Sequence, residues 1–316
     1  MQTTHAEGGR SETSWLQCNW RILKEALDTR RPLPERVKFL AIFAKNLDEF
    51  FMTRVSALLR QVTEGVLEVP FADLRPSEKL IAIRQAVMVH LTQYAECWHH
   101  DMLPQLHAAG IHILHYRELQ PKQRAFVAQY FAREIFPMLT PLALDPTHPF
   151  PYISHLSLNL AVVVNDPLRG ACFARVKVED VFPRLVRIPD EDRAERCDET
   201  GLTEMVDRNF VWLEEVIATH MDMLFPGLQV VAVYPFRVTR DAGLQFQDDA
   251  AADLLTVVEE RVGMRHFGSV VRLEVDRTMP EAIREVLMRH LRLAPSQVYT
   301  VEAPLGIAAL TPGAPL

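Results

Sequence analysis

The chain has 316 residues, a formal net charge of −7 at pH 7 and a hydrophobic content of 48%. This length predicts roughly two domains with separate cores, and no apolar run approaches the roughly 18 residues that a membrane-spanning helix needs. The acidic balance argues against a protein that holds nucleic acid by itself. The polar start MQTTHAEGGR lacks the apolar core of a signal peptide, so we expect a cytoplasmic location.

The first part of the chain, residues 1–107, has the pattern of a helical domain. Apolar spacing predicts antiparallel helices at about residues 15–28, 33–61 and 77–109. Pro32 and Pro34 suit the first turn of the second helix. No strand-like alternation interrupts these segments.

The second predicted helix contains the stretch FLAIFAKNLDEFFMTRV, residues 39–55. At about 100° per residue its apolar side chains form one stripe, and Asp48 falls outside it. Asn46 lies at the edge of the stripe and Arg54 in its middle, although burying an unpaired amide costs roughly 1–3 kcal/mol. Either both groups have partners within the domain, or the polar edge faces a cleft where a ligand satisfies it. An amide suits a nucleobase edge because it offers a donor and an acceptor.

Residues 108–305 mix helices and strands, which predicts an α+β head domain with helices packed on a mixed sheet. The predicted helices span residues 122–136, 210–224, 248–261 and 281–293. The predicted strands span residues 156–164, 171–178, 184–188, 228–241, 269–275 and 297–303. The first strand alternates as a half-buried strand does, and Thr278 to Glu281 has the pattern of a capping box. We expect a solvated loop at residues 189–201 and an unstructured tail at residues 306–316.

Familiar catalytic motifs are missing from the sequence, which holds no G-x-x-x-x-G-K-[ST], no G-x-G-x-x-G and no G-x-S-x-G. Five histidines lie between His99 and His115. They indicate either the metal site of an unrelated α+β enzyme or, because their spacing fits no standard site, a polar helix end with a solvated loop. His148 and His155 flank a proline-rich loop, where they carry function or pair with carbonyl groups that proline leaves unpaired.

Several segments resemble the bacterial polyphosphate kinases, the long ATP–polyphosphate phosphotransferases. FLAIFAKNLDEFFMTRVSALLRQV resembles that family's helix signature, and SWLQCNWRILKEAL resembles its opening pattern. LTPLALDPTHPFPYISHLSLNLAVVV resembles the start of the family's head domain, and YPFRVTRDAGL and FGSVVRLEV are similar to later head-domain segments. The resemblance covers about residues 11–305 in the right order.

The resemblance implies a helical N-terminal domain, a head domain that forms much of a homodimer contact, and two C-terminal catalytic domains. It implies transfer of the ATP γ-phosphate to inorganic polyphosphate through a phosphohistidine, with Mg²⁺. It also implies that Asn46, the asparagine of the N-L-D-E-F-F motif, contacts the nucleotide base.

The resemblance places the phosphorylated histidine, the magnesium-binding residues and most nucleotide contacts in the C-terminal half of the family. We therefore expect this chain to be the N-terminal and head portion of such a kinase, with no catalytic residue and no Mg²⁺ site of its own. Alone it is expected to bind ATP weakly at most and to be inactive. The alternative is a non-catalytic dimerisation or regulatory module derived from a polyphosphate kinase.

Overall fold

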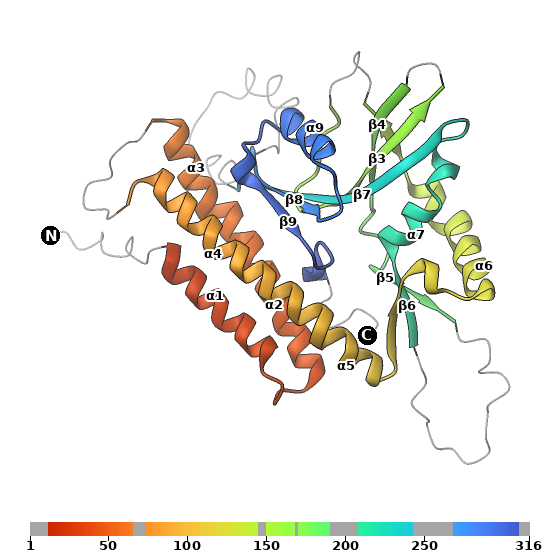
Figure 1. The fold of residues 1–316 in the computed structure, drawn as a ribbon, viewed down its shortest axis with the longest axis horizontal. Coiled ribbons are helices and arrows are strands. Elements are labelled where there is room, and N and C mark those ends of the chain that lie inside the picture. Colours follow the sequence, from red (N-terminus) through yellow and green to blue (C-terminus); the bar gives the residue numbers. More distant parts are fainter. Residues whose placement is uncertain are drawn as a thin grey trace, which may run out of the picture.

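The computed structural model describes residues 12–65, 74–144, 150–167, 170–189, 208–242 and 268–309. A layer of helices lies on one side, and the described residues of the other side form two sheets with helices beside them (Figure 1). This arrangement confirms the predicted α+β class, a helical N-terminal region followed by a head region with a mixed sheet.

The helical layer consists of long segments that lie side by side (Figure 1). The segments are α1 (Glu12–Leu27); α2 (Leu33–Phe50), which continues through a π-helical turn (Phe51–Val55) into α3 (Ser56–Thr63); and α4 (Pro76–Cys97), which continues through a second π-helical turn (Trp98–Met102) into α5 (Leu103–Ala108). Pro32 and Pro34 lie at the start of α2, as predicted.

A buried arginine joins the helices at one end of this layer. Arg36 of α2 is 0% exposed, and its Nε donates to the Ala26 carbonyl of α1 at 2.8 Å. Its guanidinium also pairs with Asp101 in the second π-helical turn. Because a buried guanidinium is tolerated only when its donors are satisfied, these contacts fix the helices relative to one another.

The larger sheet has six strands in the order β2-β4-β3-β7-β8-β9. The strands are β2 (Pro141–Ala143), β3 (Leu158–Asp166), β4 (Gly170–Lys177), β7 (Gln229–Arg240), β8 (Val270–Asp276) and β9 (Val298–Val301). Neighbouring strands are antiparallel except for β8 and β9, which are parallel and are connected through helix α9 (Glu281–Leu291). The sheet is therefore mixed, as predicted.

The smaller sheet has three strands in the order β1-β6-β5, with β1 (Ile111–Leu114), β6 (Arg208–Trp212) and β5 (Leu185–Ile188). Helices α6 (Pro121–Tyr130) and α7 (Leu213–Thr219) lie beside it (Figure 1). The prediction of a helix beginning at Phe210 is wrong, because Phe210–Trp212 belong to β6 and the helix begins at Leu213. Strand β6 pairs with β1 on one side and β5 on the other, and Phe210 and Val211 are buried, so pairing with these strands decides the conformation there.

Strand β3 lies inside the larger sheet, and the prediction that it is half-buried is wrong. Leu160 and Val162 face the core that is shared with the helical layer, whereas Ala161 between them faces a second core. Leu287 of α9 belongs to this second core. The sequence pattern of β3 could not reveal this helix, because it comes from a distant segment of the chain.

The start of α9 also differs from the prediction. Thr278 does not cap the helix; its backbone N–H and its hydroxyl both donate to Asp276, and Pro280 occupies the N-cap position. The structure therefore uses Thr278 to close the turn after β8 rather than to satisfy the first N–H groups of the helix.

The end of the described chain is more ordered than predicted. Ile307–Ala309 form a 3₁₀-helical turn against α2, and Ile307 is 2% exposed, so an unstructured tail from residue 306 is wrong for these residues. Residues 310–316, the predicted helix 248–261 and most of the predicted loop 189–201 lie outside the described residues. The domain boundary after residue 107 stays a prediction, because one apolar core continues from the helical layer into the head region.

Candidate functional site

An open groove of about 320 Å³ lies between α1 and α2, where the asparagine singled out in the sequence is found. Its lining residues come from both helices and from the π-helical turn: Trp15, Cys18, Asn19, Ile22, Asn46, Glu49, Phe50, Thr53 and Arg54. The indole of Trp15 stacks on the ring of Phe50 with centroids 4.5 Å apart, which anchors one wall of the groove. Asn46 and Arg54 therefore share one groove.

Asn46 is half-buried and has a side-chain partner on the neighbouring helix. Its Nδ2 donates to Oδ1 of Asn19 at 3.2 Å, and Nδ2 of Asn19 donates to the Phe43 carbonyl at 3.2 Å. Among the described residues, Oδ1 of Asn46 has no hydrogen-bond partner. The amide therefore bridges two helices, as the first explanation predicts, and the residue lines the groove. Binding of a ligand to the remaining acceptor stays a prediction.

The prediction that Arg54 lies in the middle of the buried stripe is wrong, because the side chain is exposed at the groove. The π-helical turn at Phe51–Val55 is the reason, since it inserts an extra residue into one turn and rotates the following side chains. Phe51, Val55 and Leu58 therefore continue the buried stripe, and Arg54 faces the groove instead.

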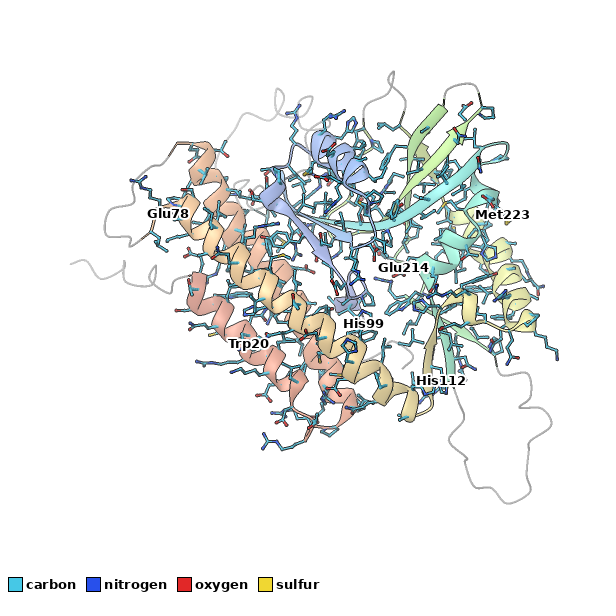
Figure 2. All side chains as sticks on the ribbon, viewed as in Figure 1. Trp20, Glu78, His99, His112, Glu214 and Met223 are labelled. Carbon is cyan, nitrogen blue, oxygen red and sulfur yellow. The ribbon has the colours of Figure 1, made fainter. Side chains whose placement is uncertain are left out.

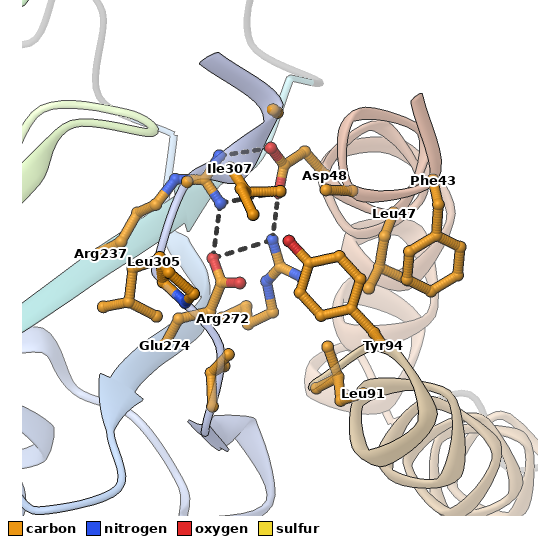
Figure 3. A pocket seen from close by; sticks show the side chains of 15 residues that line it. Phe43, Leu47, Asp48, Leu91, Tyr94, Arg237, Arg272, Glu274, Leu305 and Ile307 are labelled. Carbon is orange, nitrogen blue, oxygen red and sulfur yellow. Dashed lines mark hydrogen bonds and ion pairs between the residues drawn. The ribbon is translucent and has the colours of Figure 1, made fainter. Parts of the chain in front are cut away.

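The same helix carries a charged group that the sequence pattern placed on the outer face. Asp48 is 6% exposed and pairs with Arg237 of β7 and Arg272 of β8 (Figure 3). Nη1 of Arg237 also donates to Glu274 at 2.7 Å, and Nη2 of Arg272 lies 3.1 Å from the same carboxylate. These four residues, the buried charge cluster, connect α2 to the larger sheet.

Electrostatics within the buried charge cluster favours the ionised forms. Burial alone would raise the pKa of Asp48, but the guanidinium groups of Arg237 and Arg272 hold that pKa below its usual value. Burial, followed by the charges of Glu274 and Asp48, raises the pKa of the neighbouring Tyr94, so its hydroxyl stays protonated. The adjoining cavity measures about 20 Å³ (Figure 3), enough for a water molecule but not for a nucleotide, and Asp48 and Arg237 also line an open pocket of about 660 Å³. Because the charges of the cluster pair with one another, they join α2 to the larger sheet.

The histidines between His99 and His115 have separate partners. Nε2 of His99 lies 2.9 Å from the Glu302 carbonyl oxygen, and the rings of His107 and His112 meet edge to face at 4.2 Å. Figure 2 shows His99 and His112 at different places on the molecule. His115 pairs with Glu215 at the start of α7, and this hydrogen bond raises the pKa of His115. The structure therefore gives His99, His107, His112 and His115 contacts between segments of the chain.

Of the two histidines beside the proline-rich loop, the structure describes His155. His148 lies outside the described residues. Nδ1 of His155 accepts the backbone N–H of Arg240 at 3.0 Å, so this histidine pairs with a donor of β7 rather than with a carbonyl. It fastens the loop to the larger sheet.

The part of the chain that the structure describes offers no cluster of metal-binding side chains and no membrane-spanning helix. That part holds no group of three or more histidine, cysteine, aspartate or glutamate side chains that could bind a metal ion. Within the same ranges, none of the helices combines the length and hydropathy that crossing a bilayer requires.

Comparison with known proteins places both parts of this fold in one family. The family model "Polyphosphate kinase N-terminal domain" matches residues 10–114, and "Polyphosphate kinase middle domain" matches residues 122–312. The chain belongs to the polyphosphate kinase family. The groove with Asn46 lies within the match to the N-terminal domain, and the strands of the buried charge cluster lie within the match to the middle domain.

Individual polyphosphate kinases agree with this assignment. The chain is 44% identical over 290 residues to the polyphosphate kinase of Thermosynechococcus vestitus and 42% identical over 302 residues to that of Prosthecochloris aestuarii. These alignments cover 92% and 95% of this chain but only 38% and 41% of the two relatives. The crystal structure of polyphosphate kinase from Porphyromonas gingivalis is similar with a TM-score of 0.75 and 26% identity, over 97% of this chain and 41% of that one.

Proposed function

We propose that these residues provide the scaffold and one edge of the nucleotide pocket of a polyphosphate kinase, which transfers the γ-phosphate of ATP to inorganic polyphosphate through a phosphohistidine. The observation that carries this proposal is the position of Asn46. It occupies the asparagine of the N-L-D-E-F-F motif, lines the groove between α1 and α2, and keeps an acceptor at the groove. A volume of about 320 Å³ lies at the lower end of the range for small-molecule pockets, so the groove admits a base rather than a whole nucleotide.

The role of the chain in the reaction is to hold the base, while the transfer of phosphate depends on residues outside it. Phosphoryl transfer needs clustered positive charge, a metal ion and a placed nucleophile. The arginines of the buried charge cluster are already paired with Asp48 and Glu274, so they do not supply that charge. The 316-residue chain alone is therefore expected to form no polyphosphate from ATP, and polyphosphate formation by the purified chain would refute this division of roles.

The test of the nucleotide contact is Asn46→Ala in a complete polyphosphate kinase that contains this chain. Loss of one hydrogen bond to the base should raise the KM for ATP about three- to tenfold and leave kcat nearly unchanged, because the contact exists in the ground state and the transition state alike. Asn165→Ala is a matched control, since Asn165 is exposed on β3 and does not line the groove. An unchanged KM for ATP would assign Asn46 to the packing of α1 against α2.

Assembly and location follow from the same proposal. The protein acts as a homo-oligomer joined through the head region, in the cytoplasm, where its nucleotide substrate is found. Light scattering on the purified chain tests the assembly. A strictly monomeric chain that captures no intact kinase subunit would contradict both this assembly and the alternative of a non-catalytic dimerisation or regulatory module.

A further inference from the structure

The amide of Asn46 belongs to a short chain of hydrogen bonds whose direction is fixed at its far end. Asn19 is 2% exposed, and its side chain meets the Phe43 carbonyl at 3.2 Å. A carbonyl oxygen only accepts, so Asn19 must direct its NH₂ group toward Phe43. Its Oδ1 then necessarily faces Asn46.

The same reasoning fixes the orientation of the side-chain amide of Asn46. Because Oδ1 of Asn19 only accepts, Asn46 must direct Nδ2 toward it, and the two atoms lie 3.2 Å apart. Oδ1 of Asn46 is left on the other side of its amide, without a hydrogen-bond partner among the described residues. One N–H of the same amide also remains for a ligand.

We propose that Asn19 is a positioning residue that fixes the amide orientation of Asn46 and thereby makes the groove prefer a 6-amino purine to a 6-oxo purine. This inference rests on the proposed contact between Asn46 and the nucleotide base. Asn19 does not touch the base itself, since it acts through the direction of one hydrogen bond.

The preference follows from the donors and acceptors on the two kinds of base. The 6-amino group of adenine donates to the Oδ1 acceptor, and the adjacent ring nitrogen N1 accepts from the remaining N–H. A 6-oxo purine presents an acceptor and a donor in the reverse order, so its oxygen would face Oδ1. An amide that turns freely by 180° pairs with either base, and only a fixed amide distinguishes them.

The probes for the test are ATP and ITP, whose bases differ in the 6-amino and 6-oxo groups. Saturation-transfer NMR with the 316-residue chain compares the binding of the two probes, and the ratio of kcat/KM for ATP to that for ITP is measured in a complete kinase that contains the chain. One mismatched hydrogen-bond pair should give the unchanged protein a preference for ATP of about tenfold or more.

The substitutions distinguish two roles of Asn19, orienting the amide of Asn46 and packing between the helices. Asn19→Leu removes the fixed acceptor and should reduce the ATP-to-ITP ratio to about one, within a factor of two. Asn19→Asp loses the donor to the Phe43 carbonyl, which should lower stability, but it keeps an acceptor opposite Asn46 and should retain the preference. Ile22→Ala is the control, because Ile22 lines the groove without a polar side-chain atom and should weaken both probes equally. Thermal melting verifies that each variant folds, and Asn19→Ala replaces Asn19→Leu if that variant does not.

Three results would support or overturn the role of Asn19 in orienting Asn46. A reduced ratio in Asn19→Leu with a retained ratio in Asn19→Asp supports the inference. An unchanged ratio in Asn19→Leu, in a protein whose KM for ATP still rises with Asn46→Ala, overturns the role of Asn19 and leaves the proposed function intact. An Asn46→Ala variant with unchanged KM for both nucleotides overturns the base contact and, with it, the role of Asn19.

Discussion

Substituting Asp48 by asparagine tests whether the buried charge cluster holds the helical layer on the larger sheet. The cluster pairs two carboxylates with two guanidinium groups, and the side chains of Asp48 and Arg272 are 8% and 1% exposed. Asp48→Asn keeps the shape of the side chain but leaves the cluster with one uncompensated positive charge. Removing one partner from a buried ion pair costs about 3–5 kcal/mol, so we expect a loss of that size in the free energy of unfolding.

The pH dependence of this loss has a definite sign. The pKa of Asp48 lies below its usual value in the folded protein, so its contribution is fully present above the unfolded pKa, about 3.9. The contribution disappears as the pH falls through the lower, folded pKa. The difference in unfolding free energy between the unchanged protein and Asp48→Asn should therefore be constant between about pH 5 and pH 8 and should shrink below about pH 4.

Urea denaturation followed by tryptophan fluorescence at several pH values measures both effects. The double variant Asp48→Leu with Arg272→Met should be more stable than Asp48→Asn, because it leaves the Arg237–Glu274 pair at 2.7 Å without excess charge. Asp28→Asn, which removes a partly exposed carboxylate paired with the exposed Arg30, should change the midpoint little. A loss below about 1 kcal/mol for Asp48→Asn, or a pH dependence equal to that of the unchanged protein, would refute the argument.

Three further predictions concern stability. Phe50→Ala should cost about 3–5 kcal/mol in urea denaturation, because the ring is 1% exposed, whereas Asn46→Ala should cost less; equal losses would contradict this. The hydrogen bond that His115 donates to Glu215 raises the pKa of His115. The pair therefore stabilises the fold below about pH 6.5 and stops doing so as the pH rises through the folded pKa, and His115→Gln should remove this dependence from thermal melts between about pH 5 and pH 8. Arg292, the C-cap residue of α9, has a left-handed φ of 55°, which glycine adopts without the steric cost that a side chain adds. Arg292→Gly should therefore stabilise the protein by about 1 kcal/mol in thermal melts, and a lower melting temperature would disprove that reasoning.

The helices and most strands could be predicted because their apolar periodicity is local. The position of Arg54 could not, because a regular rotation of about 100° per residue assumes an unbroken α-helix. The π-helical turn at Phe51–Val55 breaks that assumption, and no glycine or proline marks it in the sequence. The only signal in the sequence was Arg54 itself, a charged residue at a predicted core position. It indicated that the predicted rotation of the helix was wrong there, not that an arginine is buried.

The charge cluster was missed for a different physical reason. Asp48 has a hydrophilic side chain on the predicted outer face, and its partners Arg237 and Arg272 lie on strands far away in sequence. A strand arginine between apolar residues, as in VVRLEV, was the signal that could have indicated a buried cation. Which carboxylate pairs with it depends on how the helical layer meets the sheet, and single-sequence periodicity carries no such information.

Asn46 and Asp48 are only two residues apart on α2, so their side chains leave the helix in different directions. Asp48 faces the larger sheet, where arginines of β7 and β8 bind it. Asn46 faces α1, where Asn19 binds it. The segment that carries the proposed base contact is therefore held from both sides, and a displacement of α2 toward either neighbour breaks a directed polar contact on the other. Because a hydrogen bond weakens steeply with misalignment, this double attachment keeps the acceptor of Asn46 at one place in the groove.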